Sequence, residues 1–163
     1  MIRAALLSDH ALSSSLGATV PPTWPPMFLD SAALQFTLDR FAEGPGQSGW
    51  WLYFVVLSRG ESGRTLIGSA GYKGPPSADG TVEVGYGIVS DQHRRGYATE
   101  TVRGLLARAF SLPTVRRVIA ETLPELEASI GVLHKCGFTL IDGGSEPDVI
   151  RFGLDRAAYA VRL

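Results

Sequence analysis

The hydrophobic pattern of the chain changes from a helical period to strand-like runs and back to a helical period. Near the N-terminus, residues 4–16 predict one helix that ends at Gly17. A second helix is expected after Asp30 or Ser31, either of which can cap it, and the sequence 44–46 ends it. Runs of apolar and β-branched residues then predict strands. These strands are expected at 50–57, 65–72, 81–89, 117–121, 138–141 and 149–154.

Two apolar stripes with helical spacing lie between the later strands. Short polar or glycine-bearing segments, such as 58–63, connect the strands, and no repeat or long linker divides the chain. We therefore expect one domain over residues 1–163, of the α+β class, with a mixed β-sheet flanked by helices. The first stripe is Val102, Leu105, Leu106, Ala109 and Phe110; the second is Leu126, Ile130 and Leu133, closed by Gly137.

Composition narrows the class of protein. The 163 residues carry 15 Lys and Arg against 16 Asp and Glu, whereas a nucleic-acid module normally has a basic excess. A single cysteine, Cys136, excludes an intrachain disulfide framework and indicates a reducing, cytoplasmic location. The longest apolar run, 50–57, is far shorter than the roughly 20 residues that span a bilayer, so no membrane association is expected. His10, His93 and His134 lack metal-ligand spacing, so no metal is expected.

A short basic turn between a strand and a helix is the strongest candidate for binding chemistry. Arg94 and Arg95 precede Gly96 where the helix is expected to begin, and the N–H groups of a helix N-terminus attract anions. Gly96 lets the backbone adopt left-handed angles and approach a ligand closely. One interpretation is a pyrophosphate cradle; the other is a solvated basic turn. Gly85 and Gly87 lack the third glycine of the dinucleotide fingerprint, and no P-loop signature is present.

Two motifs, in the expected order and separation, resemble those of the GNAT superfamily of N-acyltransferases. The first motif resembles the acetyl-CoA motif of that superfamily. It consists of Arg95-Gly96-Tyr97-Ala98-Thr99-Glu100 and stands after Val84-Gly85-Tyr86-Gly87-Ile88. The segment 120–138 is similar to the RimJ/RimL-like branch, the ribosomal-protein N-terminal acetyltransferase-like group. The resemblance is close over 67–138. It implies a GNAT-type twisted mixed β-sheet whose central strands splay apart, with acetyl-CoA bound in the opening as co-substrate.

The resemblance also implies roles for the residues of the basic turn. The backbone of Ile88 and Val89 would bind pantetheine. Three positions depart from the family: His93 replaces Gln or Arg, Leu126 replaces an asparagine of this branch, and Leu133 stands where many members have a tyrosine acid. The amides that would hold the pyrophosphate belong to His93, Arg94, Arg95, Gly96, Tyr97, Ala98 and Thr99.

Acyl transfer to an amine requires a neutral amine: a lysine-type amine needs a good general base, whereas an α-amine could react with a weak base or a water molecule. Glu83 is the candidate base, because strand alternation places it on the nominal face of Gly85 and Gly87; the other interpretation is a structural carboxylate. Ser129 matches a family serine near the CoA sulfur and could protonate the leaving thiolate; the other interpretation is a helix serine bonded to its own backbone. Together with these residues, the resemblance implies an acetyl-CoA-dependent N-acetyltransferase that transfers directly to a primary amine of a protein N-terminus or a small metabolite.

Two other functions fit the same sequence. The three departures favour a catalytically inactive CoA-binding regulatory module, and the basic turn alone fits a phosphate- or nucleotide-binding domain.

The resemblance implies that the N-terminal region supplies the acceptor site, with Trp24, Pro25 and Pro26 as candidate lining, whereas core packing is the expected role of Trp50 and Trp51. Members of the branch commonly form homodimers, although no interface signature stands in this sequence.

Overall fold

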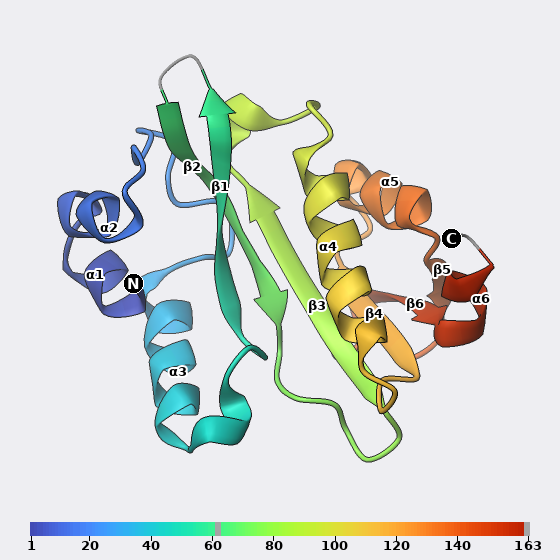
Figure 1. Cartoon of the computed structure of the whole chain (residues 1–163). Helices are drawn as coiled ribbons and strands as arrows, with labels where there is room; N and C mark the ends of the chain where they lie inside the picture. The colour runs from blue at the N-terminus through green and yellow to red at the C-terminus, as the bar shows by residue number, and fades with distance from the viewer. Residues whose placement is uncertain (61–62, 162–163) are drawn as a thin grey trace. The chain divides into compact units, whose positions relative to one another are not determined.

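One mixed sheet of six strands, in the order β1-β2-β3-β4-β6-β5, organises the computed structural model (Figure 1), which describes residues 1–60 and 63–161. β3 pairs with β4 in parallel, whereas β6 pairs with both β4 and β5 in antiparallel fashion. This mixed sheet with helices confirms the predicted α+β class. The strands are β1 (Leu52–Gly60), β2 (Gly63–Tyr72), β3 (Thr81–Ile88), β4 (Arg117–Thr122), β5 (Thr139–Ile141) and β6 (Ile150–Asp155).

The chain divides into two compact units. The first comprises residues 1–70 and 86–97, and the second comprises residues 71–85 and 98–163. β2 and β3 each run from one unit into the other along the chain. The expectation of one domain over residues 1–163 stays a prediction.

The N-terminal helix predicted over residues 4–16 is wrong as a single element, because the chain breaks it at Ser8. Ser8 has extended backbone (φ −174°, ψ 160°), and its side chain accepts a hydrogen bond from the Ala11 N–H at 3.1 Å. The residue therefore ends one helix and caps the next. Gly17 ends the second helix as predicted, with φ 57°. The helices of the described first unit are α1 (Ile2–Leu7), α2 (Asp9–Leu16) and α3 (Ser31–Ala42), the last capped by Asp30.

β1 begins at Leu52, later than the pattern predicted. The two tryptophans before it belong to a connection that follows a 3₁₀ turn, η1 (Pro45–Gln47). The Trp51 Nε1–H donates to the Gln47 side chain at 2.9 Å, and Trp51 is only 8% exposed, so its expected core role is confirmed. The connection predicted at 58–63 falls partly on residues 61–62, which lie outside the described residues.

The second unit contains the helices whose stripes the sequence predicted. The first stripe packs as expected, whereas in the second only Leu133 is buried: Ile130 is half-buried, and Leu126 is half-buried and stands just before the helix. Every residue of the first stripe is buried in α4, and Leu133 is fully buried in α5. Gly137 closes α5 with φ 95°, as predicted. In the described part of the chain no helix combines the length and apolar character that a bilayer crossing requires. The helices are α4 (Tyr97–Ser111), α5 (Glu127–Cys136) and α6 (Arg156–Ala160).

α6 was not predicted, and an arginine at its start explains its position. The guanidinium of Arg156 donates to the carbonyl oxygens of Phe110, Leu112 and Val115 at 2.8, 2.5 and 2.8 Å. These carbonyls stand at and just after the C-terminal end of α4, where backbone acceptors have no partner within the helix. One side chain thereby satisfies the end of one helix and holds the beginning of another.

Candidate functional site

The basic turn after β3 contains two residues with left-handed backbone. Arg94 has φ 60° and Gly96 has φ 86°, and a short 3₁₀ turn, η2 (Ser90–Gln92), leads into them. Turns of this kind present successive N–H groups as an anion-binding concavity. A Cβ atom built on Gly96 would meet nothing within 4 Å, so this side of the backbone is open. The side chains of Arg94 and Arg95 are exposed at the same turn, immediately before α4 begins.

Hydrogen bonds at the end of β3 brace this turn from within. The His93 Nε2 lies 2.7 Å from the Ile88 carbonyl oxygen, and a carbonyl only accepts, so Nε2 carries the proton in this contact. The Val89 N–H donates to the Ile67 carbonyl at 2.9 Å, and the Val89 carbonyl accepts from the Gln92 N–H at 3.0 Å. Val89 is therefore bonded within the protein. The N–H of Ile88 points to the opposite edge of the strand, because backbone groups of successive residues alternate.

Glu83 and the two glycines of β3 lie on one face of the strand, as predicted. Val82 and Val84 are each 2% exposed and point to the other face. The Glu83 side chain is 22% exposed and forms an ion pair with Lys73 through Oε1. A Cβ atom built on Gly85 would meet nothing within 4 Å. The pairing of β3 with β4 reaches only to Val84, so Gly85 is the first residue of β3 beyond that register.

Residues 20–29, here called the Trp-Pro loop, are tied to the end of β3 and to η2. A Cβ atom on Gly87 would lie 3.1 Å from the Cβ of Pro26, so the loop packs closely on the strand. The Thr23 hydroxyl donates to Asp91 Oδ1 at 2.9 Å. Trp24 packs against Phe54 with ring centroids 6.0 Å apart. The candidate lining residues thus differ: Trp24 is half-buried, Pro25 is exposed and Pro26 is buried.

α5 carries Ser129 and the single cysteine. Ser129 lies half-buried in the first turn of the helix, and its N–H donates to the Leu126 carbonyl at 2.9 Å. Cys136 is 6% exposed, and its thiol donates to the Thr99 carbonyl at 3.7 Å. Burial raises the pKa of the Cys136 thiol, and Arg103 offsets this only in part. A buried, protonated thiol is a poor nucleophile, so Cys136 serves packing rather than covalent catalysis.

A charged cluster in the second unit was missed by sequence reasoning. Glu121 on β4 stands directly opposite Arg151 on β6, and its Oε1 accepts from Nε and Nη2 of Arg151 at 2.8 and 2.7 Å. Both carboxylate oxygens of Glu121 also accept from Ser145, from the N–H at 2.9 Å and from the hydroxyl at 2.6 Å. The cluster fixes the loop between β5 and β6 to the sheet. Among the described residues, no group of three or more His, Cys, Asp and Glu side chains is placed to hold a metal.

We expect the Glu121 cluster to make stability depend on acid pH. Burial of Glu121 raises its pKa, but the hydrogen bonds from Ser145 and Arg151 outweigh burial and leave it below the ordinary value of 4.5. A carboxyl with a lowered folded pKa stabilises the fold above its unfolded pKa and loses that contribution as pH falls. Urea unfolding between pH 3 and pH 7 should therefore show a steeper loss of stability in the native protein than in E121Q. Equal slopes for the two proteins would contradict this assignment.

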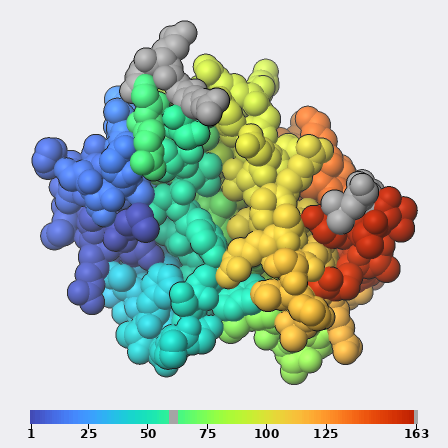
Figure 2. Space-filling model, viewed as in Figure 1, coloured from blue at the N-terminus to red at the C-terminus, as the bar shows by residue number. Residues whose placement is uncertain are grey.

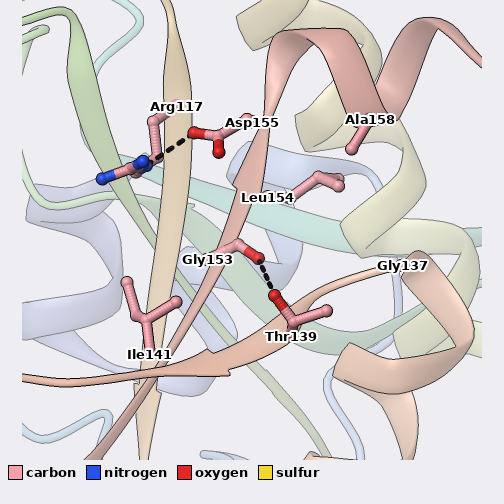
Figure 3. A pocket seen from close by; sticks show the side chains of 8 residues that line it. All are labelled: Arg117, Gly137, Thr139, Ile141, Gly153, Leu154, Asp155 and Ala158. Carbon is pink, nitrogen blue, oxygen red and sulfur yellow. Dashed lines mark hydrogen bonds and ion pairs between the residues drawn. The ribbon is translucent and has the colours of Figure 1, made fainter.

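Two hollows on the surface do not contain the basic turn or Glu83. The smaller, about 100 Å³, lies in the second unit, and Figure 3 shows that its Arg117 and Asp155 are paired with each other, at 2.6 Å. The larger, about 570 Å³, lies in the first unit on segments coloured blue to green in Figure 2. Its lining residues are Met1, Ile2, Leu16, Phe41, Leu52, Tyr53, Phe54, Val56 and Arg64.

Comparison with known proteins places these features in a family. The family model for the acetyltransferase (GNAT) domain matches residues 4–139. The uncharacterized N-acetyltransferase YjdG of Bacillus subtilis (strain 168) is 26% identical over 141 residues, which cover 86% of this chain and 81% of YjdG.

Solved structures agree with this fold. A mutant form of the spermidine N-acetyltransferase SpeG from Vibrio cholerae has a TM-score of 0.61 at 13% identity, over 82% of this chain and 79% of that chain. The aminoglycoside acetyltransferase AAC(6')-Ib, in complex with coenzyme A, has a TM-score of 0.58 at 21% identity, over 71% of each chain. The protein therefore belongs to the GNAT acetyltransferase family and is an N-acetyltransferase.

Proposed function

We propose that this N-acetyltransferase uses acetyl-CoA and transfers its acetyl group directly to a primary amine, on a protein N-terminus or a small metabolite. The observation that carries the proposal is the basic turn. Left-handed backbone at Arg94 and Gly96, an open side at Gly96 and the adjacent start of α4 fit the pyrophosphate of CoA. Hydrogen bonds to charged groups contribute roughly 1.5–3 kcal/mol each, so several amides in this turn would anchor the donor.

Each part of the donor has candidate partners in this chain. The amides of residues 94–99 would bind the pyrophosphate, whereas the His93 N–H donates to the Ser90 carbonyl at 3.3 Å. The exposed guanidinium groups of Arg94 and Arg95 would add positive charge. The Ile88 N–H would bind pantetheine, while Val89 supports that strand end through its bond to Ile67. His93 replaces a family side chain and, by bonding to the Ile88 carbonyl, would keep the turn in shape rather than contact the donor.

The acceptor amine must lose a proton before it attacks. At pH 7 this costs roughly 4–5 kcal/mol for a lysine-type amine and about 1 kcal/mol for an α-amine. We assign the base to Glu83, on the face of β3 that is open at Gly85. Lys73 contacts this carboxylate through Oε1 and holds it in place. An incoming ammonium group would replace Lys73 as the partner of Glu83 and then give up its proton to the carboxylate.

The transfer itself forms one bond and breaks another. The amine nitrogen bonds to the acetyl carbonyl carbon, the carbon–sulfur bond breaks, and the electron pair leaves on the CoA sulfur. The proton that the nitrogen loses as it becomes an amide passes through water and replaces the one that the sulfur takes up. We assign protonation of that thiolate to Ser129, directly or through a water molecule, in the first turn of α5.

The proposal also includes membership of the RimJ/RimL-like branch, one domain over residues 1–163 and a cytoplasmic location.

Thermal unfolding with and without acetyl-CoA tests the donor site. A ligand at 100 times its dissociation constant stabilises the folded state by about 2.7 kcal/mol, which raises Tm by roughly 5–10 °C for a chain of this length. We expect a shift of this size with acetyl-CoA and a clearly smaller one with ADP. The variant G96A should lose most of the shift, because alanine disfavours the left-handed backbone at this position.

A matched control separates this effect from general strain. Gly44 also has positive φ (138°) and an open side, but it lies outside the basic turn, so G44A should keep the full acetyl-CoA shift. Equal shifts with ADP and acetyl-CoA would favour the phosphate- or nucleotide-binding alternative. A shift with acetyl-CoA but no CoA release with any amine would favour the inactive regulatory module.

A further inference from the structure

The tip of the Trp-Pro loop (residues 20–29) is a tight turn with an aromatic residue at an unfavourable position. The Leu29 N–H donates to the Pro26 carbonyl at 3.2 Å, which makes residues 26–29 a β-turn. Phe28, the third residue of this turn, has φ 67°. Glycine or asparagine is the usual residue there, because other side chains disfavour left-handed backbone. Phe28 is therefore not the residue that would best stabilise the turn.

The burial pattern shows that the two end residues of the turn are buried and that its tip is exposed to solvent. Pro26 is buried against Gly87, and Leu29 is 8% exposed in a core cluster with Ile2 and Leu34. Phe28 is 74% exposed and Met27 is 68% exposed. A strained backbone that persists between two anchored residues, with its apolar side chains in solvent, is typical of a functional surface rather than of packing.

The loop lies against the same two elements that flank the proposed donor site within the first unit. Pro26 contacts β3 at Gly87, and Thr23 bonds to Asp91 in η2, directly before the basic turn. These two contacts fix the loop relative to the strand end on which Ile88 would bind pantetheine. Groups at the loop tip are therefore held near the donor-binding end of β3 by the protein itself.

The chemistry of the loop selects one class of acceptor over another. No Asp, Glu, Lys or Arg stands between His10 and Asp30 in the sequence. The Asp30 carboxylate accepts from the Ala33 N–H at 2.8 Å as the cap of α3. A polycationic acceptor such as spermidine forms charge-assisted hydrogen bonds with carboxylates, and this loop supplies none. A thioether and a phenyl ring instead offer a surface for an aliphatic or aromatic group.

We infer that Met27 and Phe28 determine acceptor specificity, and that the acceptor carries its primary amine beside an apolar group, as an N-terminal Leu or Phe residue does. The inference rests on the proposed function, because it places the acceptor of the acetyl transfer against this loop. Apolar contact of this size typically changes kcat/KM by about 10- to 200-fold.

Steady-state kinetics on four dipeptides, Leu-Gly, Phe-Gly, Ser-Gly and Asp-Gly, test the inference, with spermidine as a fifth acceptor. The dipeptides share an α-amine, so differences report the side chain. We expect kcat/KM for Leu-Gly and Phe-Gly to exceed that for Ser-Gly by about tenfold or more. F28N should abolish this preference through KM, with kcat nearly unchanged and no loss of Tm, because asparagine tolerates left-handed backbone. F28L should retain the preference.

L7A is the matched control, since Leu7 on α1 is 79% exposed in the same unit and lies outside the Trp-Pro loop. It should leave every KM unchanged. Acetyl-CoA binding without a preference for apolar dipeptides, or a preference that survives F28N, would overturn the inference and leave the proposed function standing. An absence of acetyl-CoA binding in the thermal assay would overturn both.

Discussion

Replacing Glu83 with glutamine should lower kcat by about 100-fold or more at pH 7 and leave the Kd for acetyl-CoA unchanged. A positioned general base contributes about 100- to 10,000-fold, and glutamine keeps the size of the side chain but accepts no proton. Glu83 lies on the face of β3 opposite buried Val82 and Val84, outside the basic turn that would bind the donor. Initial rates of CoA release and a separate donor-binding titration measure the two quantities.

The pH profile distinguishes a lost base from a damaged site. Above the pKa of the acceptor amine, solvent supplies neutral amine, so the deficit of E83Q should shrink as pH rises. The control is K73M, which removes the ion pair with Glu83 but retains the carboxylate, and it should keep most of the activity. If E83Q matches the native rate at pH 7, Glu83 is a structural carboxylate and the base is another group or a water molecule.

Replacing Gly68 with alanine should lower Tm by about 2–12 °C. A Cβ atom at this buried position on β2 would lie 2.2 Å from the Gly87 carbonyl oxygen and 2.8 Å from the Ile88 Cδ1. Overpacking of this kind costs about 1–3 kcal/mol, and 1 kcal/mol corresponds to roughly 2–4 °C at this chain length. Thermal and urea unfolding of G68A measure the loss. Because Ile88 must move, the acetyl-CoA shift should also decrease.

A second glycine provides the control for backbone effects. Gly104 lies inside α4, where a Cβ atom would meet nothing within 4 Å. G104A should raise stability by about 0.5–1 kcal/mol, because alanine loses less backbone entropy in a helix. If G68A proves as stable as G104A, that result would contradict the close approach of β2 and β3 at Gly68.

Local patterns predicted much of the secondary structure. The stripe of α4, the glycine cap of α5 and the Asp30 cap of α3 depend on residues within a few positions of one another, so spacing and capping chemistry suffice to find them. The break at Ser8 was missed because apolar spacing continues across it, although the capping serine was visible in the sequence. α6 was missed because its anchor, Arg156, bonds to carbonyls far away in the chain.

The sequence alone identified the basic turn, its glycine and the carboxylate on β3, because their types and order are local properties of the chain. Tertiary structure decided what each of them touches. Lys73 reaches Glu83 only because β2 and β3 are neighbouring strands of the sheet, and Glu121 meets Arg151 only through the register of β4 with β6. Phe28 became informative through its positive φ and its exposure. Contacts between distant segments depend on register and packing of the whole chain, which local spacing does not encode.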